Sequence, residues 1–271
     1  MKDPLQSKDT VKITVDLPRD LVAGLDAVRE STGRGLPELM EQALGQFLRG
    51  EERTEVLYLS APVDALMKGF YEENTRLAEL RSHGDFGLGT FNHLDGEMVM
   101  LDGVVYQLKA DGTALIVRDE VETPFACVTA FHPTTVEEFE GELEYAGFKN
   151  LLDRLIPSEN LFYAVRVDGL FSNVKVWSVS KQSPSQPISS VTPSLREFGD
   201  IEGTLSGFYT PRFIKSISMA GYHLHFLTAD RTRGGHMYQC SLKKARISLQ
   251  FLRKLELNLP VTIDYLTAHL I

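Results

Sequence analysis

The stretch GYHLHFLTADRTRGGH, residues 221–236, constrains the fold more than any other part of the sequence. Its first half alternates as a β-strand does, so His223 and His225 are expected on one face, about 7 Å apart along the chain. The polar residues Thr228–Gly235 end in Gly-Gly and predict the loop of a hairpin. The return strand would begin at His236, opposite the first two histidines. Three of the seven histidines are thus predicted to meet.

A cluster of three neutral imidazoles without a fourth protein ligand is typical of a Zn2+ site with an open position, used for catalysis. The alternative is that these are surface or hydrogen-bonding histidines brought together by chance. The spacing does not name a reaction, because carbonic anhydrases and cupins also combine an HxH pair with a third histidine. Cys127 and Cys240 are the only cysteines, so neither a disulfide framework nor a cysteine zinc site is indicated.

The composition is that of a globular protein with one large or two modest cores: 271 residues, 43% hydrophobic and 24% charged. A net charge of −9 argues against a body coated in nucleic acid but leaves room for a small DNA-binding surface. The start, MKDPLQSKDT, lacks the features of a signal peptide, and no apolar run is long enough to span a bilayer. A cytoplasmic protein without membrane contact is therefore expected.

Residues 10–50 are predicted to form a separate small domain. VKITVDLP (Val11–Pro18) alternates as a strand, and two apolar stripes at helical spacing follow, separated by Gly33 and Gly35. One strand and two short helices cannot bury this much apolar surface alone. The domain is therefore expected to make the protein a homodimer or a higher homo-oligomer.

This segment resembles the ribbon-helix-helix domain of the MetJ/Arc/CopG type in the runs KITVDLP, STGRG and ELMEQALGQFL. In that family, strands from two protomers pair into a ribbon that enters the major groove of DNA. The resemblance implies that Lys12, Thr14 and Asp16 read base edges of operator DNA. A pure dimerisation module is the alternative, because acidic residues outnumber basic ones here.

Residues 55–271 have the texture of an α+β domain. Helices are predicted around Val63–Phe70 and Asn74–Arg81, and further helical stretches around Thr135–Leu155. Gly103 and Gly169 are expected at turns between strands. The predicted strands are EMVMLDGVVYQL, CVTAFHP, LFYAVRVDGLF and VKVWSV, and the loop-like stretch is Ser180–Ser194.

A second dense motif is GDFGLGTFNHLDGEM, residues 84–98. It is not a phosphate-binding loop, because the Lys-Ser/Thr pair of that motif is missing. Glu97, beside the turn that opens the next strand, could carry a proton or be a surface carboxylate. The spacing by itself favours the surface carboxylate.

These motifs together resemble the alpha-acetolactate decarboxylase family over nearly all of residues 56–271. The resemblance rests on the two motifs above and on TPFACVTAF, LFYAVRVDGLFSNVKVWSVSKQ and IEGTLSGFYTP. It implies an α+β fold with a mixed β-sheet and a zinc ion held by His223, His225 and His236. The implied reaction converts 2-acetolactate, a 2-hydroxy-3-oxo acid, to acetoin and carbon dioxide, with the metal as Lewis acid. Glu97 matches the family's glutamate for proton transfer.

The sequence departs from the family at two places. Trp177 stands where family members carry an arginine that contacts the substrate, and an indole cannot make a bidentate carboxylate contact. Lys175, two residues earlier on the same strand face, is expected to replace part of that charge in catalysis. The sequence that ends in LTAHLI has no match for a glutamate that the family carries on a C-terminal tail.

Two functions follow from these observations. The first is a zinc-dependent acetolactate decarboxylase with an added oligomerisation segment. The second is a transcriptional regulator, in which an impaired decarboxylase domain senses acetolactate or a related acid and alters DNA binding by the ribbon-helix-helix dimer. A hydrolytic enzyme resembling carbonic anhydrase would explain the histidines but none of the other motifs.

Overall fold

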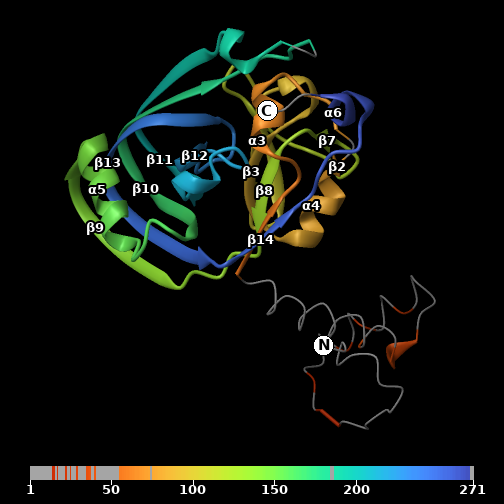
Figure 1. Ribbon diagram of the computed structural model, residues 1–271. Coiled ribbons are helices and arrows are strands. Elements are labelled where there is room, and N and C mark those ends of the chain that lie inside the picture. Colours follow the sequence, from red (N-terminus) through yellow and green to blue (C-terminus); the bar gives the residue numbers. More distant parts are fainter. Residues whose placement is uncertain are drawn as a thin grey trace. The chain divides into compact units, whose positions relative to one another are not determined.

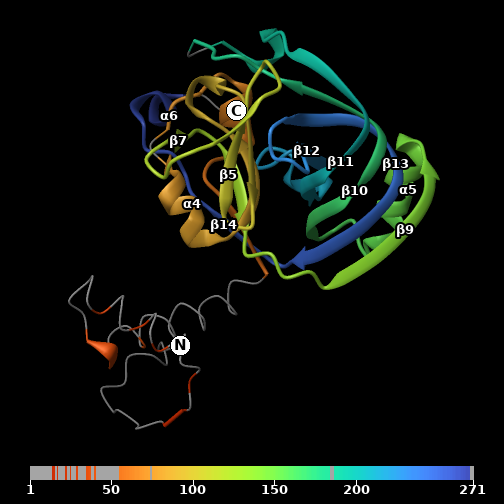
Figure 2. The same ribbon diagram turned by 180° about the vertical axis from the view of Figure 1, so that it is seen from behind.

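The computed structural model describes residues 55–73, 75–183 and 186–268, and ten positions within residues 1–54. The chain divides into two units, residues 1–51 and residues 52–271. The larger unit contains two main β-sheets and four short helices among its described residues (Figures 1 and 2).

The first sheet has seven strands, with β1 parallel to β14 and antiparallel to β8, so it is mixed. An α+β class with a mixed sheet is thereby confirmed for this unit. In spatial order, its strands are β14 (Lys254–Leu257), β1 (Val56–Leu59), β8 (Ala126–Thr129), β3 (Phe86–Thr90), β4 (Glu97–Leu101), β5 (Val104–Leu108) and β6 (Ala114–Ile116).

The second sheet has five strands and curves back on itself, because β10 pairs with both β11 and β13 while β12 also lies between β11 and β13. Its strands are long and strongly bent in Figure 1. In spatial order they are β10 (Phe162–Ser178), β11 (Ser194–Thr210), β12 (Gly221–Thr228), β13 (Gly234–Leu252) and β9 (Thr135–Leu143). A minor pair consists of β2 (Thr75–Arg76) and β7 (Glu122–Thr123).

Helices cover the remaining apolar faces. α5 packs against β9 and β13, and Phe148, Leu151 and Leu152 from one of its faces enter the core of the five-stranded sheet. α4 places Leu77 and Leu80 against the outer face of the seven-stranded sheet. The helices are α3 (Val63–Met67), α4 (Leu77–His83), α5 (Tyr145–Leu155) and α6 (Ile263–Thr267), with 3-10 turns at Asn92–Leu94, Ile188–Ser190 and Arg212–Ile214.

A second core fills the space between the two sheets. Leu88 and Val99 of the seven-stranded sheet meet Phe208 and Leu227 of the five-stranded sheet there. Because successive strand residues point to opposite faces, β12 directs Leu224 into the core of its own sheet and its odd-numbered residues toward the other sheet. The space between the sheets is where the histidines lie.

Two local predictions were wrong. Gly169 is not at a turn but in the middle of β10, where it pairs with Ala245 of β13. A Cβ atom at Gly169 would lie 2.2 Å from the carbonyl oxygen of Lys244, so a glycine is required by the close approach of the strands. The stretch Thr135–Leu143, expected to be helical, is the edge strand β9, and only Tyr145–Leu155 forms a helix. In β9 the tertiary pairing with β13 overrides the local helical pattern.

The ribbon-helix-helix prediction falls largely on residues outside the described part of the chain, including Lys12 and Asp16. Thr14 is described and exposed. The boundary and the role of a domain at residues 10–50 therefore stay predictions. None of the helices in the described part of the chain combines the length and apolar character needed to cross a lipid bilayer.

Candidate metal centre and its cavity

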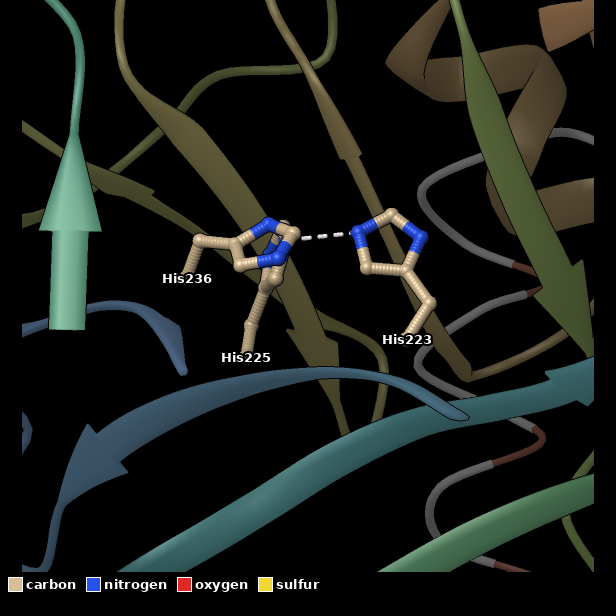
Figure 3. A group of neighbouring side chains, drawn as sticks. All are labelled: His223, His225 and His236. Atoms are coloured by element: carbon tan, nitrogen blue, oxygen red, sulfur yellow. Dashed lines mark hydrogen bonds between the residues drawn. The ribbon is translucent and has the colours of Figure 1, made fainter. Parts of the chain in front are cut away.

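The three histidines come from one antiparallel strand pair. His223 and His225 lie on β12 with their side chains on the face away from Leu224, and His236 on β13 is the cross-strand partner of His225. Figure 3 shows the three imidazole rings converging on one point. The predicted meeting of the three residues is confirmed, and the hairpin loop is shorter than expected because β13 already begins at Gly234.

The spacing of the ring nitrogens suits a tetrahedral ion. The Nε2 atom of His225 lies 3.2 Å from Nε2 of His223 and 3.2 Å from Nδ1 of His236. Two nitrogen ligands about 2.05 Å from a tetrahedral zinc ion would lie about 3.3 Å apart. The ligand atoms of all three side chains lie within 4.8 Å of one another, so they form a candidate site for one metal ion.

The orientation of His225 is fixed from behind by β4. Its Nδ1 atom lies 2.8 Å from the carbonyl oxygen of Met98, to which it donates a hydrogen bond. This bond selects the tautomer in which Nε2 presents a lone pair to the centre. His225 is completely buried, so no water competes for the contact.

Burial keeps the imidazoles neutral. It lowers the pKa of His225 to about 4, and the Met98 carbonyl offsets only part of the effect. The pKa values of His223 and His236 are also lowered well below the usual range, by burial and by the neighbouring histidines. The cluster therefore offers three unprotonated nitrogen donors at neutral pH, the form that binds a metal.

Glu97 is the first residue of β4 and faces the same space. A carboxylate oxygen of Glu97 lies 3.6 Å from Nε2 of His225. Burial raises the pKa of Glu97 to about 8, because it removes water from the charged form of the carboxyl. Glu97 is thus a buried carboxyl beside the histidines, which excludes the surface carboxylate that the spacing by itself favoured and agrees with the position that the family resemblance implied.

The turn before β4 sets the direction of Glu97. Gly96 has φ +86°, and a Cβ atom there would lie 2.5 Å from the carbonyl oxygen of Leu108, so only glycine fits. Thr90 of β3 is the cross-strand partner of Glu97, and its hydroxyl donates a hydrogen bond of 2.7 Å to the Gly96 carbonyl. The turn and the cross-strand pair together hold the Glu97 side chain toward the histidines.

A cavity of about 270 Å3 opens onto the centre, close to the lower end of the range of about 300–1,000 Å3 for small-molecule sites. His223 and His236 line it, whereas His225 lies behind them. A fourth ligand could therefore reach an ion from this side. Its other lining residues are Val63, Leu66, Met67, Gly89, Thr90, Leu94, Glu97, Phe125, Trp177, Val179, Ile188, Val191, Pro193 and Met219.

Trp177 forms one wall of this cavity. It is the cross-strand partner of His236, and their rings are stacked with centroids 4.1 Å apart and planes at 21°. Lys175 lies two residues earlier in β10 and does not line the cavity. A role for Lys175 in catalysis stays a prediction that the arrangement does not support.

The chain matches the family model for alpha-acetolactate decarboxylase over residues 57–271. It is 41% identical to an alpha-acetolactate decarboxylase of Methanosarcina mazei over 222 residues, which are 80% of this chain and 76% of that protein. It is 40% identical to the Klebsiella aerogenes protein of the same name, over 85% of this chain and 91% of that protein. The chain belongs to the alpha-acetolactate decarboxylase family.

The structure of this acetolactate decarboxylase family member agrees with that assignment. The crystal structure of alpha-acetolactate decarboxylase from Bacillus subtilis superposes with a TM-score of 0.77 at 35% identity, covering 79% of this chain and 93% of that chain. The family match contains every side chain around the cavity and begins after the predicted domain at residues 10–50. Zinc as the ion, and the individual roles of the site residues, belong to the proposal below.

Several residues of the site were missed by the sequence analysis. Thr90 and Phe125 lie inside motifs that identified the family, so their positions carried a signal. The carbonyl oxygen of Met98 carried none, because a backbone group has no residue type. α3 also carried none, since its apolar face reads as ordinary core until the two sheets leave a cavity beside it.

Proposed function

We propose that this protein decarboxylates 2-acetolactate to acetoin and carbon dioxide, with a Zn2+ ion held by His223, His225 and His236. The observation that carries the proposal is the convergence of three neutral imidazoles and the buried carboxyl of Glu97 at the end of one small cavity. A carboxy-lyase of this family needs an electron sink and a proton source, and the cavity supplies candidates for both.

When bound, the zinc ion would supply Lewis-acid chemistry to the oxygens of a 2-hydroxy-3-oxo acid. The donor set fits this ion, because imidazole is a preferred zinc ligand and His225 Nε2 lies 3.2 Å from a ring nitrogen of each of the other two histidines, close to the separation in a tetrahedral site. His223 and His236 leave the cavity side open for the substrate, while the Met98 carbonyl keeps His225 in the ligating tautomer.

Glu97 is proposed as the proton donor. Loss of carbon dioxide breaks one carbon–carbon bond and leaves an electron pair that a proton must take up to give acetoin. The carboxyl group of Glu97 lies 3.6 Å from Nε2 of His225 and lines the cavity, so it is placed to deliver that proton to a ligand held there. Thr90 and Gly96 act as positioning residues, since they hold the start of β4 in place.

The test is acetoin formation from racemic acetolactate by the purified, zinc-loaded, full-length protein, beside its His223→Ala variant. Turnover that requires both zinc and His223 is the expected result. A zinc-loaded sample that releases no carbon dioxide, in an assay where an established family member does, would contradict the proposal.

A second candidate is a ligand sensor fused to a DNA-binding domain at residues 10–50, with operator DNA as partner. Two observations favour it: no lysine or arginine is among the described residues lining the cavity, and residues 1–51 form a separate unit outside the family match. Lys12, Thr14 and Asp16 would contact DNA, and the domain would join two copies of the chain. A fragment of residues 51–271 is expected to form a smaller oligomer in solution than the full chain does. It should also lose the ability of the full chain to retain operon DNA at low salt. An unchanged oligomeric state, with no DNA retained by the full chain, would exclude this candidate.

A further inference from the structure

The cavity in front of the histidines contains no cationic side chain. Among the described residues that line it, Glu97 is the only carboxylic acid, and none is lysine or arginine. Beside these described lining residues, a bound metal ion would therefore be the sole positive charge at the cavity wall. A carboxylate there either contacts the ion or lies against hydrocarbon, because no guanidinium or ammonium group is present to pair with it.

Hydrocarbon forms most of the wall. α3 contributes Val63 and Leu66, both buried, and the loop before β11 contributes Ile188 and Val191. Phe125 from the seven-stranded sheet side is also buried against the cavity. Affinity beyond that supplied by chelation of the ion would come mainly from apolar contact with the ligand.

Trp177 is the fixed part of this wall. Its ring is stacked on His236, and its backbone is paired on both sides, with His236 of β13 and Leu195 of β11. The indole cannot leave the cavity without losing the stack. It therefore presents a rigid apolar surface beside the metal ligands, where the substituents of a chelating ligand would lie.

We propose that Trp177 is a specificity-determining residue that makes this cavity prefer 2-hydroxy-3-oxo acids with larger apolar substituents over acetolactate itself. This inference rests on the proposed function and goes beyond it in naming the preferred substrate. The ligand class is a metal-chelating hydroxy-keto acid that carries an ethyl or longer alkyl group in place of a methyl group.

The decisive comparison uses the zinc-loaded, full-length protein with acetolactate and with its homologue that carries ethyl instead of methyl on the carbon bearing the carboxylate. We expect kcat/KM to be at least about fourfold higher for the ethyl acid, the factor for burying one further methylene. Trp177→Phe keeps an apolar ring and should keep the preference. Trp177→Arg adds a cation, so it should lower KM for acetolactate and remove the preference.

A binding measurement separates the preference from turnover. Calorimetric titration of the zinc-loaded protein with acetoin and with its one-methylene-longer homologue needs no reaction. The longer hydroxyketone should bind about fourfold more tightly, with a more negative heat-capacity change.

Each outcome bears on one of the two claims. Equal kcat/KM for both acids and equal affinity for both hydroxyketones would overturn the preference and leave the reaction intact. Decarboxylation of neither acid, with hydroxyketones still binding in the expected order, would overturn the reaction and support the preference. A preference that survives in Trp177→Arg would assign it to the other walls and overturn the role of Trp177. Should that variant not fold, Trp177→Ala, which removes the apolar ring, takes its place, and a preference that survives there would overturn the role in the same way.

Discussion

The indole ring of Trp177 lies in a stack with the imidazole ring of His236, with ring centroids 4.1 Å apart. Trp177 is the only tryptophan in the chain, so the intrinsic tryptophan fluorescence comes from a residue in contact with a candidate metal ligand. The emission is therefore a direct optical probe of the site.

We predict that metal binding changes this fluorescence. Titration with Co2+, whose unfilled d shell quenches nearby indole emission, should reduce the signal to a plateau at one ion per chain, and excess Zn2+ should restore it. The His223→Ala variant serves as the control, because it retains the stack but loses a ligand. A fluorescence signal that stays flat with Co2+ would contradict metal binding beside His236.

Substitution of the central ligand should remove the metal. We expect His225→Ala to lose stoichiometric zinc, measured by elemental analysis after dialysis, and to lose more than about 1,000-fold in kcat/KM. The Met98 carbonyl would lose its hydrogen bond from His225, so the free energy of unfolding should also fall by about 1–3 kcal/mol. His132→Ala, at an exposed histidine, is the matched control and should retain its zinc. Full zinc content in His225→Ala would refute the assignment.

Removal of the proton donor should slow the chemistry without emptying the site. Glu97→Gln keeps the shape of the side chain, so we expect normal zinc content and a kcat reduced about 100- to 10,000-fold. Glu137→Gln, at an exposed position of β9, should leave both quantities unchanged. A Glu97→Gln variant with wild-type kcat would show that another group delivers the proton.

Glu73 predicts a pH dependence of stability away from the metal site. Burial raises the pKa of this carboxyl to about 7, and a hydrogen bond of 3.2 Å from the Thr262 hydroxyl lowers it only in part. The folded-state pKa of Glu73 lies above the unfolded value, so the folded state binds the proton more tightly. The stabilisation from this group is therefore fully present below about pH 4 and is lost as the pH rises through 7. The free energy of unfolding should therefore be lower at pH 8 than at pH 5 by about 1–2 kcal/mol from this group.

Chemical denaturation at the two pH values measures this contribution. Glu73→Gln should remove that part of the difference, whereas Glu159→Gln, at an exposed position, should not. The same pH dependence in wild type and Glu73→Gln would exclude Glu73 as its source.

The positions of the histidines could be predicted from the sequence more accurately than the course of β10, the strand that carries Trp177. The alternation at His223 and His225 follows from local geometry alone, and the hairpin to His236 follows from the polar loop. β10 is different, because its pairing with β13 has register shifts between Leu170 and Asn173. Before the shifts, odd-numbered residues such as Val167 face the core of the five-stranded sheet, whereas after them even-numbered Val176 does. Trp177 reaches the cavity only because of this change of face, which no alternation pattern predicts.

The cavity itself could not be predicted from the sequence. Leu66 and Val191 are far apart in the chain and have no polar signature, and they become neighbours only when the loop before β11 and α3 meet at the junction of the two sheets. Glu97 was recognised by its motif, but its burial depends on the same junction. Long-range packing therefore decides which residues surround a ligand, whereas local patterns decide which residues can chelate an ion.

Glu97 and Met98 are consecutive residues of β4, so one peptide bond joins the proposed proton donor to the carbonyl that orients His225. Thermal sliding of one sheet over the other would displace both groups by the same amount. The relative alignment of acid and imidazole is therefore governed by covalent geometry and one hydrogen bond across the sheet interface. A substitution that displaces β4 would therefore disturb the acid and the orientation of His225 together.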